Sequence, residues 1–196
     1  MQRLREKLLV FRVSEGKDHR AFEALYSAYR PKIYQFVYFK VSNQEEVEDI
    51  AAQVFLKAWE YLTDEKTKRV QNFRAFIYQL TRNLVIDFYR RQGRAPQQVE
   101  LQTLDEESEI EDPRSAILLN KFLYEEDRAY LNKYLKDIKD EYREAVILRY
   151  LEEATIEEIA EILGKTPGNV RVLIHRGLNA LRSAVLADHT SQNQEH

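Results

Sequence analysis

Apolar residues recur at intervals of three and four along the 196-residue chain, and no clear run alternates apolar and polar residues. A period near 3.6 residues is typical of amphipathic helices, whereas a period of two is typical of strands. Glycine and proline, which interrupt helices, number only five and four. The pattern therefore predicts an all-α fold. The expected helices span residues 1–13, 18–29, 31–41, 45–62, 73–91, 114–137, 139–151, 155–163 and 167–186. Within 114–137 the sequence also allows a break.

An acidic segment separates these helices into two groups. Residues 97–113 hold seven acidic residues and no basic one, so this stretch is too polar to bury a core. We therefore expect two small helical domains joined by an acidic linker. The expected boundaries are 1–94 for the first domain, 95–113 for the linker, 114–186 for the second domain and 187–196 for a disordered tail.

The second domain contains a pattern typical of a helix-turn-helix. Helix 155–163 opens with the capping-box pair Thr155 and Glu158, and Gly164 follows its last turn. A further helix then begins near Pro167, a residue suited to a first helical turn. The same spacing also fits a plain αα-hairpin. The spacing alone leaves both structures open.

The helix after Pro167 separates apolar from basic residues. At 100° per residue, its apolar and polar arcs do not overlap. Residues 164–185 carry four bases and no acid, although 138–163 carries eight acids and three bases. A basic face beside acidic neighbours favours contact with DNA phosphates, and arginine also reads guanine in the major groove. The apolar arc holds Val170, Leu173, Ile174, Leu178, Leu181 and Val185, and the polar arc holds Arg171, Val172, His175, Arg176, Asn179 and Arg182.

Helix 73–91 carries a second pattern that favours nucleic acid. Its expected core stripe is Phe73, Phe76, Ile77, Leu80, Leu84 and Phe88. Its opposite arc interleaves tyrosines with arginines, which suits single-stranded nucleic acid because rings stack on bases while guanidiniums hold phosphates. Alternatively, the tyrosines cover a partner helix. The residues of this arc are Tyr78, Gln79, Arg82, Ile86, Tyr89 and Arg90, with Asn83 at its edge and Arg91 and Arg94 beyond.

Helix 45–62 presents one leucine outside its apolar face. Leu56 lies about opposite the core positions, among Asp49, Gln53 and Glu60. A single exposed leucine needs no explanation. An exposed leucine ringed by acidic and polar residues is also a suitable anchor for a protein partner.

These segments, in this order, resemble the sigma-70 family of bacterial RNA polymerase initiation factors, in particular its small two-domain extracytoplasmic-function (ECF) group. "AFEALYSAYRPKIYQFVYFKV" and "EVEDIAAQVFLKAWEYL" look like the start of sigma region 2, and "FRAFIYQLTRNLVIDFYRR" looks like its promoter-melting helix. "DEYREAVILRYLEEATIEEIAEILGKTPGNVRVLIHRGLNALR" looks like region 4. The resemblance covers about residues 8–186.

The resemblance implies a bacterial sigma factor that binds core RNA polymerase and directs it to promoter DNA. The linker would thread the polymerase channels, and the polymerase β flap and an anti-sigma factor are further implied partners. Residues implied to bind the β′ clamp helices are Asp49, Gln53, Leu56 and Glu60. Those implied to capture the −10 strand are Tyr78, Arg82, Asn83, Tyr89, Arg90 and Arg91. Those implied to read the −35 duplex are Lys165, Asn169, Arg171, Val172, His175 and Arg176.

The sequence departs from the family pattern at three places. Ala52-Gln53 stands where Gln-Glu is common in the clamp-binding helix, and Val172-Leu173 replaces a common polar pair. Gly177 stands where alanine is usual. Because glycine destabilises a helix interior, we expect another backbone to pack closely against Gly177.

Other functional classes explain less of the chain. A stand-alone helix-turn-helix regulator accounts for the second domain but not for helix 73–91, and a helical adaptor leaves the basic face unexplained. An enzyme is disfavoured, because the four histidines are scattered and no phosphate-binding loop or metal-ligand cluster appears. We expect no cofactor and no metal. Without cysteine or an apolar run of roughly 20 residues, we expect a cytoplasmic protein that inserts into no membrane.

Overall fold

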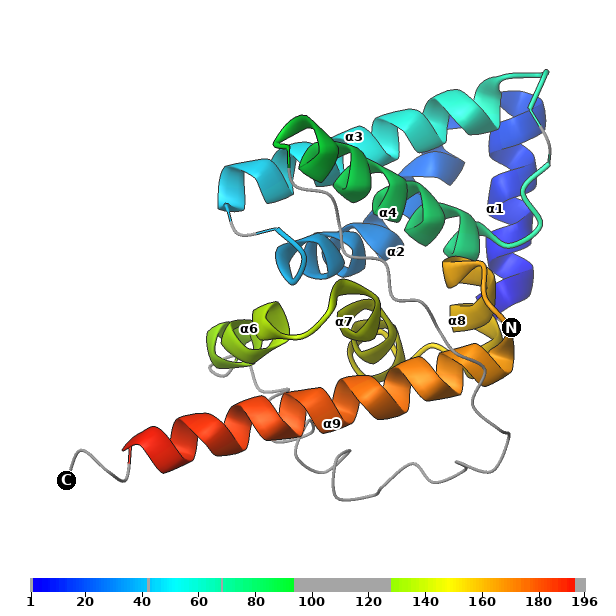
Figure 1. Cartoon of the computed structure of the whole chain (residues 1–196). Coiled ribbons are helices and arrows are strands. Elements are labelled where there is room, and N and C mark those ends of the chain that lie inside the picture. Colours follow the sequence, from blue (N-terminus) through cyan, green and yellow to red (C-terminus); the bar gives the residue numbers. More distant parts are fainter. Residues whose placement is uncertain (1, 42, 68, 94–127, 193–196) are drawn as a thin grey trace. The chain divides into compact units, whose positions relative to one another are not determined.

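The structure is a computed structural model that describes residues 2–41, 43–67, 69–93 and 128–192. Every regular element in these ranges is helical, as the apolar periodicity predicts (Figure 1). The chain divides into two compact units, Met1–Ala95 and Pro96–His196. The predicted acidic linker at 95–113 and the expected start of helix 114–137 lie outside the described residues.

The first unit contains four helices. They are α1 (Gln2–Gly16), α2 (His19–Tyr38), α3 (Gln44–Thr63) and α4 (Phe73–Arg91). Helix α3 packs on α2 and on α4, and α1 crosses the ends of α3 and α4 (Figure 1). The buried centre consists of aliphatic and aromatic side chains, among them Val13, Leu25, Ile33, Phe36, Val54, Phe73 and Ile77.

Side-chain caps fix the starts of α2, α3 and α4. Asp18, Asn43 and Asn72 each accept a hydrogen bond from a backbone N–H of the following helix, which satisfies one of its orphan donors. The Ala21 amide first, and then the Arg12 guanidinium, lower the pKa of Asp18. A lowered pKa means that the stabilisation by this cap is present above the usual aspartate pKa, and is lost as the pH falls through the folded value.

Helix α2 corrects the prediction that the chain breaks at Pro31. A single helix runs from His19 to Tyr38, with Pro31 inside it. Proline removes the hydrogen bond to the carbonyl four residues earlier, that of Ser27. Pro31 and Ser27 are both exposed, so water can reach that carbonyl, while Ile33 and other residues of the opposite face are buried. Packing of the buried face therefore outweighs the local preference against helix.

The second unit is built around one long helix. Its elements are α6 (Arg128–Asp137), α7 (Asp140–Val146), the π-helical turn η2 (Ile147–Leu151), α8 (Ile156–Leu163) and α9 (Pro167–Gln192). Helices α6, α7 and α8 all pack on α9 (Figure 1). The predicted capping box is present: Glu158 N–H donates to Thr155 Oγ1 at 3.2 Å, and Thr155 N–H donates to Glu158 Oε2 at 3.0 Å. Gly164 ends α8 in the left-handed conformation, with φ of 64°.

Helix α9 continues beyond the point where we expected a disordered tail. It reaches Gln192 instead of fraying after Ala187. The physical reason is Asp188, whose Oδ2 accepts a hydrogen bond from the Tyr134 hydroxyl at 2.6 Å. Its Oδ1 lies 2.9 Å from the Lys133 ammonium. These two residues of α6 hold the end of α9 against the unit.

We expect Asp188→Ala to destabilise the second unit, by about 1–3 kcal/mol, because it removes an acceptor shared by a hydroxyl and a charged ammonium. The measurement is hydrogen exchange of α6 and α9 in the full chain, which should both exchange faster. Glu157→Ala is the matched control, since Glu157 is an exposed carboxylate of α8. Unchanged exchange in α6 would contradict this account of the helix end.

Candidate functional site

The separation of apolar and polar arcs predicted for α9 is present in the structure. All six residues of the predicted apolar arc are buried against the unit. Arg171, His175, Asn179 and Arg182 are exposed, and Val172 and Arg176 are half-buried. The first turn of α9 has no acidic residue, and Asn169 N–H donates to Thr166 Oγ1 at 3.2 Å. We call the exposed arc of Arg171, His175, Asn179 and Arg182 the arginine face. The positive end of the helix dipole lies next to this face, an arrangement that suits anionic phosphate groups.

Lys165 is held differently from the other residues of the predicted −35 set. Its Nζ lies 3.3 Å from Oε1 of Glu141 on α7, and the two side chains are only 21% and 15% exposed. The family resemblance implies that Lys165 is one of the residues that read the −35 duplex. The fold brings Glu141 from α7 beside it, and the pair joins the turn to that helix.

Gly177 lies in close contact with α7, as its position in the apolar arc predicts. A Cβ at this position would lie 2.7 Å from Val146 Cγ2 and 3.0 Å from the carbonyl oxygen of Tyr142. Helices α7 and α9 therefore cross with almost no space between Gly177 and the backbone of Tyr142. This crossing fixes the rotation of α9 and, with it, the direction of the arginine face.

Helix α4 is rotated relative to the predicted stripe, by roughly 60° if each residue turns 100°. Tyr78 is fully buried and packs edge-on against Phe36, with 5.4 Å between ring centroids. The prediction that Tyr78 lies on the solvent face is therefore wrong. Thr81 is also buried. Its hydroxyl donates a hydrogen bond to the Ile77 carbonyl at 2.7 Å, so this polar group has its partner within the helix. Burial of these two polar-looking side chains turns Phe76 partly outward.

The remaining predicted residues of α4 differ in accessibility. Asn83, Arg90 and Arg91 are exposed, and Arg82 is half-buried. The Tyr89 hydroxyl donates to the carbonyl of Lys40, so this ring is tied to the segment that follows α2. Tyr89 therefore supports the helix and is less available for stacking than its position in the arc indicates.

An aromatic pair that the sequence did not predict lies beside the loop at 64–72. Tyr61 of α3 and Phe76 of α4 are both half-buried, and their ring centroids are 4.8 Å apart. The apolar periodicity of helix 73–91 predicts Phe76 in the core, and no sequence pattern points to Tyr61. Their position at the paired ends of α3 and α4 is a tertiary feature. The only sequence signal was an aromatic residue on each side of the loop.

The loop itself is well anchored next to this pair. The Thr67 hydroxyl donates to the carbonyl of Tyr61 at 2.6 Å, and the backbone N–H of Lys66 donates to Asp64 Oδ1 at 2.9 Å. The Arg69 guanidinium bonds Glu15 of α1 at 2.6 Å. A hollow of about 250 Å³ lies between the loop, Tyr61 and the end of α1. The ends of α1 and α3 and the loop together form a concave surface beside the aromatic pair.

The exposed face of α3 carries the four residues predicted to bind polymerase. Asp49, Gln53 and Glu60 are exposed, and Leu56 among them is 59% exposed. The opposite face buries Val47, Val54 and Ala58 completely. The helix therefore presents one large aliphatic side chain within a polar, acidic surface.

A metal-binding cluster and a membrane-spanning helix are both absent from the part of the chain that the structure describes. No group of three or more His, Asp or Glu side chains there could hold a metal ion. No helix there is both long enough and apolar enough to cross a membrane.

Comparison with known protein families identifies both units. Residues 25–95 match the family model Sigma-70 region 2, and residues 129–181 match Sigma-70, region 4. The chain thus carries the two domains of a sigma-70 factor.

Curated relatives place the chain in one group of this family. It is 32% identical over 189 residues to the ECF RNA polymerase sigma factor SigW of Bacillus subtilis (strain 168), covering 90% of this chain and 96% of the relative. It is 28% identical over 192 residues to the ECF RNA polymerase sigma-E factor of Escherichia coli (strain K12), covering 94% and 96%. The chain belongs to the ECF group of the sigma-70 family, whose members direct RNA polymerase to promoters and initiate transcription.

Two solved structures show the same fold. CnrH in complex with the cytosolic domain of CnrY matches with a TM-score of 0.69 and 21% identity, covering 94% of this chain and 99% of that one. The sigma factor RpoE in complex with the anti-sigma factor NepR, from Bartonella quintana, matches with a TM-score of 0.60 and 19% identity, covering 85% and 98%. A sigma factor is a non-enzymatic polymerase subunit, so the alternative of a regulator that acts without polymerase is set aside.

Proposed function

We propose that the two units of this sigma factor divide promoter recognition between duplex and single-stranded DNA. The second unit binds the −35 duplex through α9. The observation that carries this proposal is the exposed, acid-free arc of Arg171, His175, Asn179 and Arg182 above a completely buried apolar arc. A helix held rigidly on one side and basic on the other fits the major groove, where arginine bonds guanine bidentately. Lys165, which is paired with Glu141, supports the turn.

The first unit captures the melted −10 strand. Exposed Asn83, Arg90 and Arg91 of α4 provide polar and cationic groups for the strand. The pair Tyr61 and Phe76 offers rings on which an unpaired base can stack, beside the hollow under the loop at 64–72. Arg82 also belongs to α4 and is half-buried. Tyr78 is not part of this site, because it is buried.

Core RNA polymerase binds the exposed face of α3. Leu56 is the apolar anchor, and the surrounding Asp49, Gln53 and Glu60 provide polar complementarity. The polymerase β′ clamp helices are the proposed partner at this face, with the β flap as a second contact for region 4. The linker at 95–113 follows the polymerase channels. An anti-sigma factor is a further proposed partner, supported by the complex of the related RpoE with NepR.

We expect the double change Tyr61→Ala with Phe76→Ala to impair promoter opening by roughly tenfold or more, because base stacking on an aromatic ring is worth about 1–3 kcal/mol. The measurement is permanganate reactivity of −10 thymines in the holoenzyme complex. Recruitment to the closed promoter should fall less, because the −35 contacts remain.

The matched control for this experiment is Phe11→Ala, which removes an exposed ring of α1 from the same unit. Circular dichroism of each variant shows whether the helices persist. Full permanganate reactivity in a folded double variant would refute the stacking role of Tyr61 and Phe76.

A further inference from the structure

The outer face of α1 is an apolar surface that the polymerase and promoter contacts proposed above do not use. Leu4, Leu8 and Phe11 are 77%, 57% and 55% exposed. Their spacing of four and three residues places them in one line along the helix, over about two turns. Single exposed apolar residues are ordinary on protein surfaces, whereas an aligned, contiguous set marks an interaction site.

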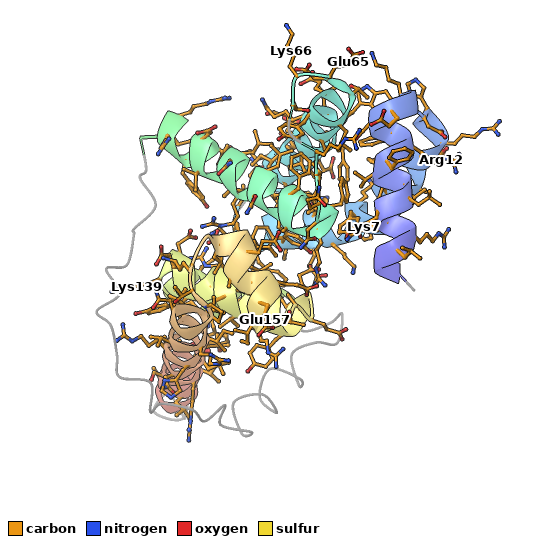
Figure 2. The ribbon with its side chains drawn as sticks, turned by 90° about the vertical axis from the view of Figure 1, so that its right-hand side faces the viewer. Lys7, Arg12, Glu65, Lys66, Lys139 and Glu157 are labelled. Atoms are coloured by element: carbon orange, nitrogen blue, oxygen red, sulfur yellow. The ribbon has the colours of Figure 1, made fainter. Side chains whose placement is uncertain are left out.

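Cations border this apolar line on both sides. Figure 2 shows Lys7 and Arg12 on opposite sides of α1, and Arg5 is exposed as well. Arg12 is paired with Asp18 at 2.6 Å, whereas neither Arg5 nor Lys7 has an ion-pair partner within the described residues. A ligand for this face must therefore combine apolar groups with negative charge.

A hollow at the Phe11 end of the Leu4-Leu8-Phe11 line indicates the shape of a ligand that fits this face. It measures about 180 Å³ and lies between α1 and the loop. Its lining consists of Lys7, Val10, Phe11, Ser14, Val70, Gln71 and the ion pair of Arg69 with Glu15. A hollow of this size accepts one large aliphatic or aromatic side chain. The straight line and the terminal hollow together fit an amphipathic helix with an apolar residue at each turn and one bulky anchor.

We propose that the Leu4-Leu8-Phe11 face of α1 is a docking surface for an acidic amphipathic helix of a protein regulator. A lipid surface fits less well, because a flat bilayer would leave the hollow unfilled. A second copy of the chain fits less well too, because the cations that border the two lines would repel each other. This surface is separate from the α3 face assigned to polymerase, so the proposal stands or falls independently of that assignment.

The test uses the full chain and two synthetic helical peptides of roughly four turns. Both peptides carry leucines at i, i+3, i+4 and i+7, with glutamates flanking them in one and lysines in the other. We expect the glutamate peptide to bind roughly tenfold more tightly than the lysine peptide, because the cations beside the line favour it. Fluorescence anisotropy measures both affinities.

Two leucines provide a matched pair of variants, since Leu8 is 57% exposed and Leu56 is 59% exposed. Leu8→Ser should weaken binding of the glutamate peptide by about tenfold, whereas Leu56→Ser should leave it unchanged. Lys7→Glu should narrow or reverse the preference between the peptides. All three positions are exposed, so the fold should persist in each variant.

Three kinds of result would overturn the proposal. The first is a failure of specificity, seen either as equal binding of the two peptides or as equal weakening by Leu8→Ser and Leu56→Ser. The second is Leu8-dependent binding to phosphatidylglycerol vesicles without peptide binding, which would assign the face to lipid. The third is Leu8-dependent self-association in sedimentation, which would assign it to a second copy of the chain.

Discussion

Leu56→Asp should abolish capture of core RNA polymerase by this sigma factor while its helices remain intact. The Leu56 side chain is 59% exposed on the outer face of α3, so replacing it removes no packing from the core. In the complex, however, an aspartate would be desolvated among side chains that already include Asp49 and Glu60. Loss of an apolar anchor costs about 2–4 kcal/mol at an interface centre, and an unpaired buried charge adds to that cost.

A binding assay with purified core polymerase measures this effect as a loss of at least roughly 100-fold in affinity. Leu8→Asp is the matched control, because Leu8 is equally exposed but lies on α1. It should retain polymerase binding. Retained binding by Leu56→Asp, in a variant with an unchanged helical spectrum, would remove α3 from the polymerase interface.

Gly177→Ala should destabilise the second unit and weaken use of the −35 element. The new methyl group would lie 2.7 Å from Val146 Cγ2 and 3.0 Å from the Tyr142 carbonyl oxygen. Overpacking of this kind costs about 1–3 kcal/mol, and the gain of about 1 kcal/mol in helix propensity offsets only part of it. We therefore expect a net loss of up to about 2 kcal/mol, and a slight rotation of the arginine face.

Hydrogen exchange of α7 and α9 in the full chain measures this loss in the unit where it occurs. Gly168→Ala is the matched control, because its Cβ would meet only Thr166 Oγ1, at 4.0 Å. Adding Val146→Ala to Gly177→Ala should restore part of the stability, because the side-chain clash disappears while the contact with the Tyr142 carbonyl remains. If Gly177→Ala is as stable as the wild type, the close crossing of α7 and α9 does not require a glycine at position 177.

The family pattern described in the sequence analysis, taken alone, would instead predict that alanine is tolerated at position 177. The sequence indicated a close approach only because a glycine interrupts an otherwise apolar arc. Which backbone approaches it, and at what distance, depends on where α7 crosses α9. That crossing involves residues about 30 positions apart in the chain, and no local pattern encodes its geometry.

Helix α4 shows the limit of periodicity at a candidate site. The spacing of its apolar residues predicted a helix over 73–91, and the structure contains α4 at Phe73–Arg91. The buried face was predicted less well, because Tyr78 and Thr81 count as polar in a sequence pattern. The Thr81 hydroxyl is satisfied within the helix itself, which makes its burial inexpensive, and the Tyr78 ring packs against Phe36.

The sequence by itself determined the helical fold, the helix-turn-helix with its capping box, the two arcs of α9 and the exposure of Leu56. These features depend on residues within a few positions of one another, where propensity and periodicity act directly. The tertiary structure decided the continuity of α2 through Pro31, the burial of Tyr78, the Tyr61–Phe76 pair, the Lys165–Glu141 ion pair and the length of α9. Each of these depends on a distant segment that covers a face or supplies a partner, and the free energy of that packing exceeds the local preference.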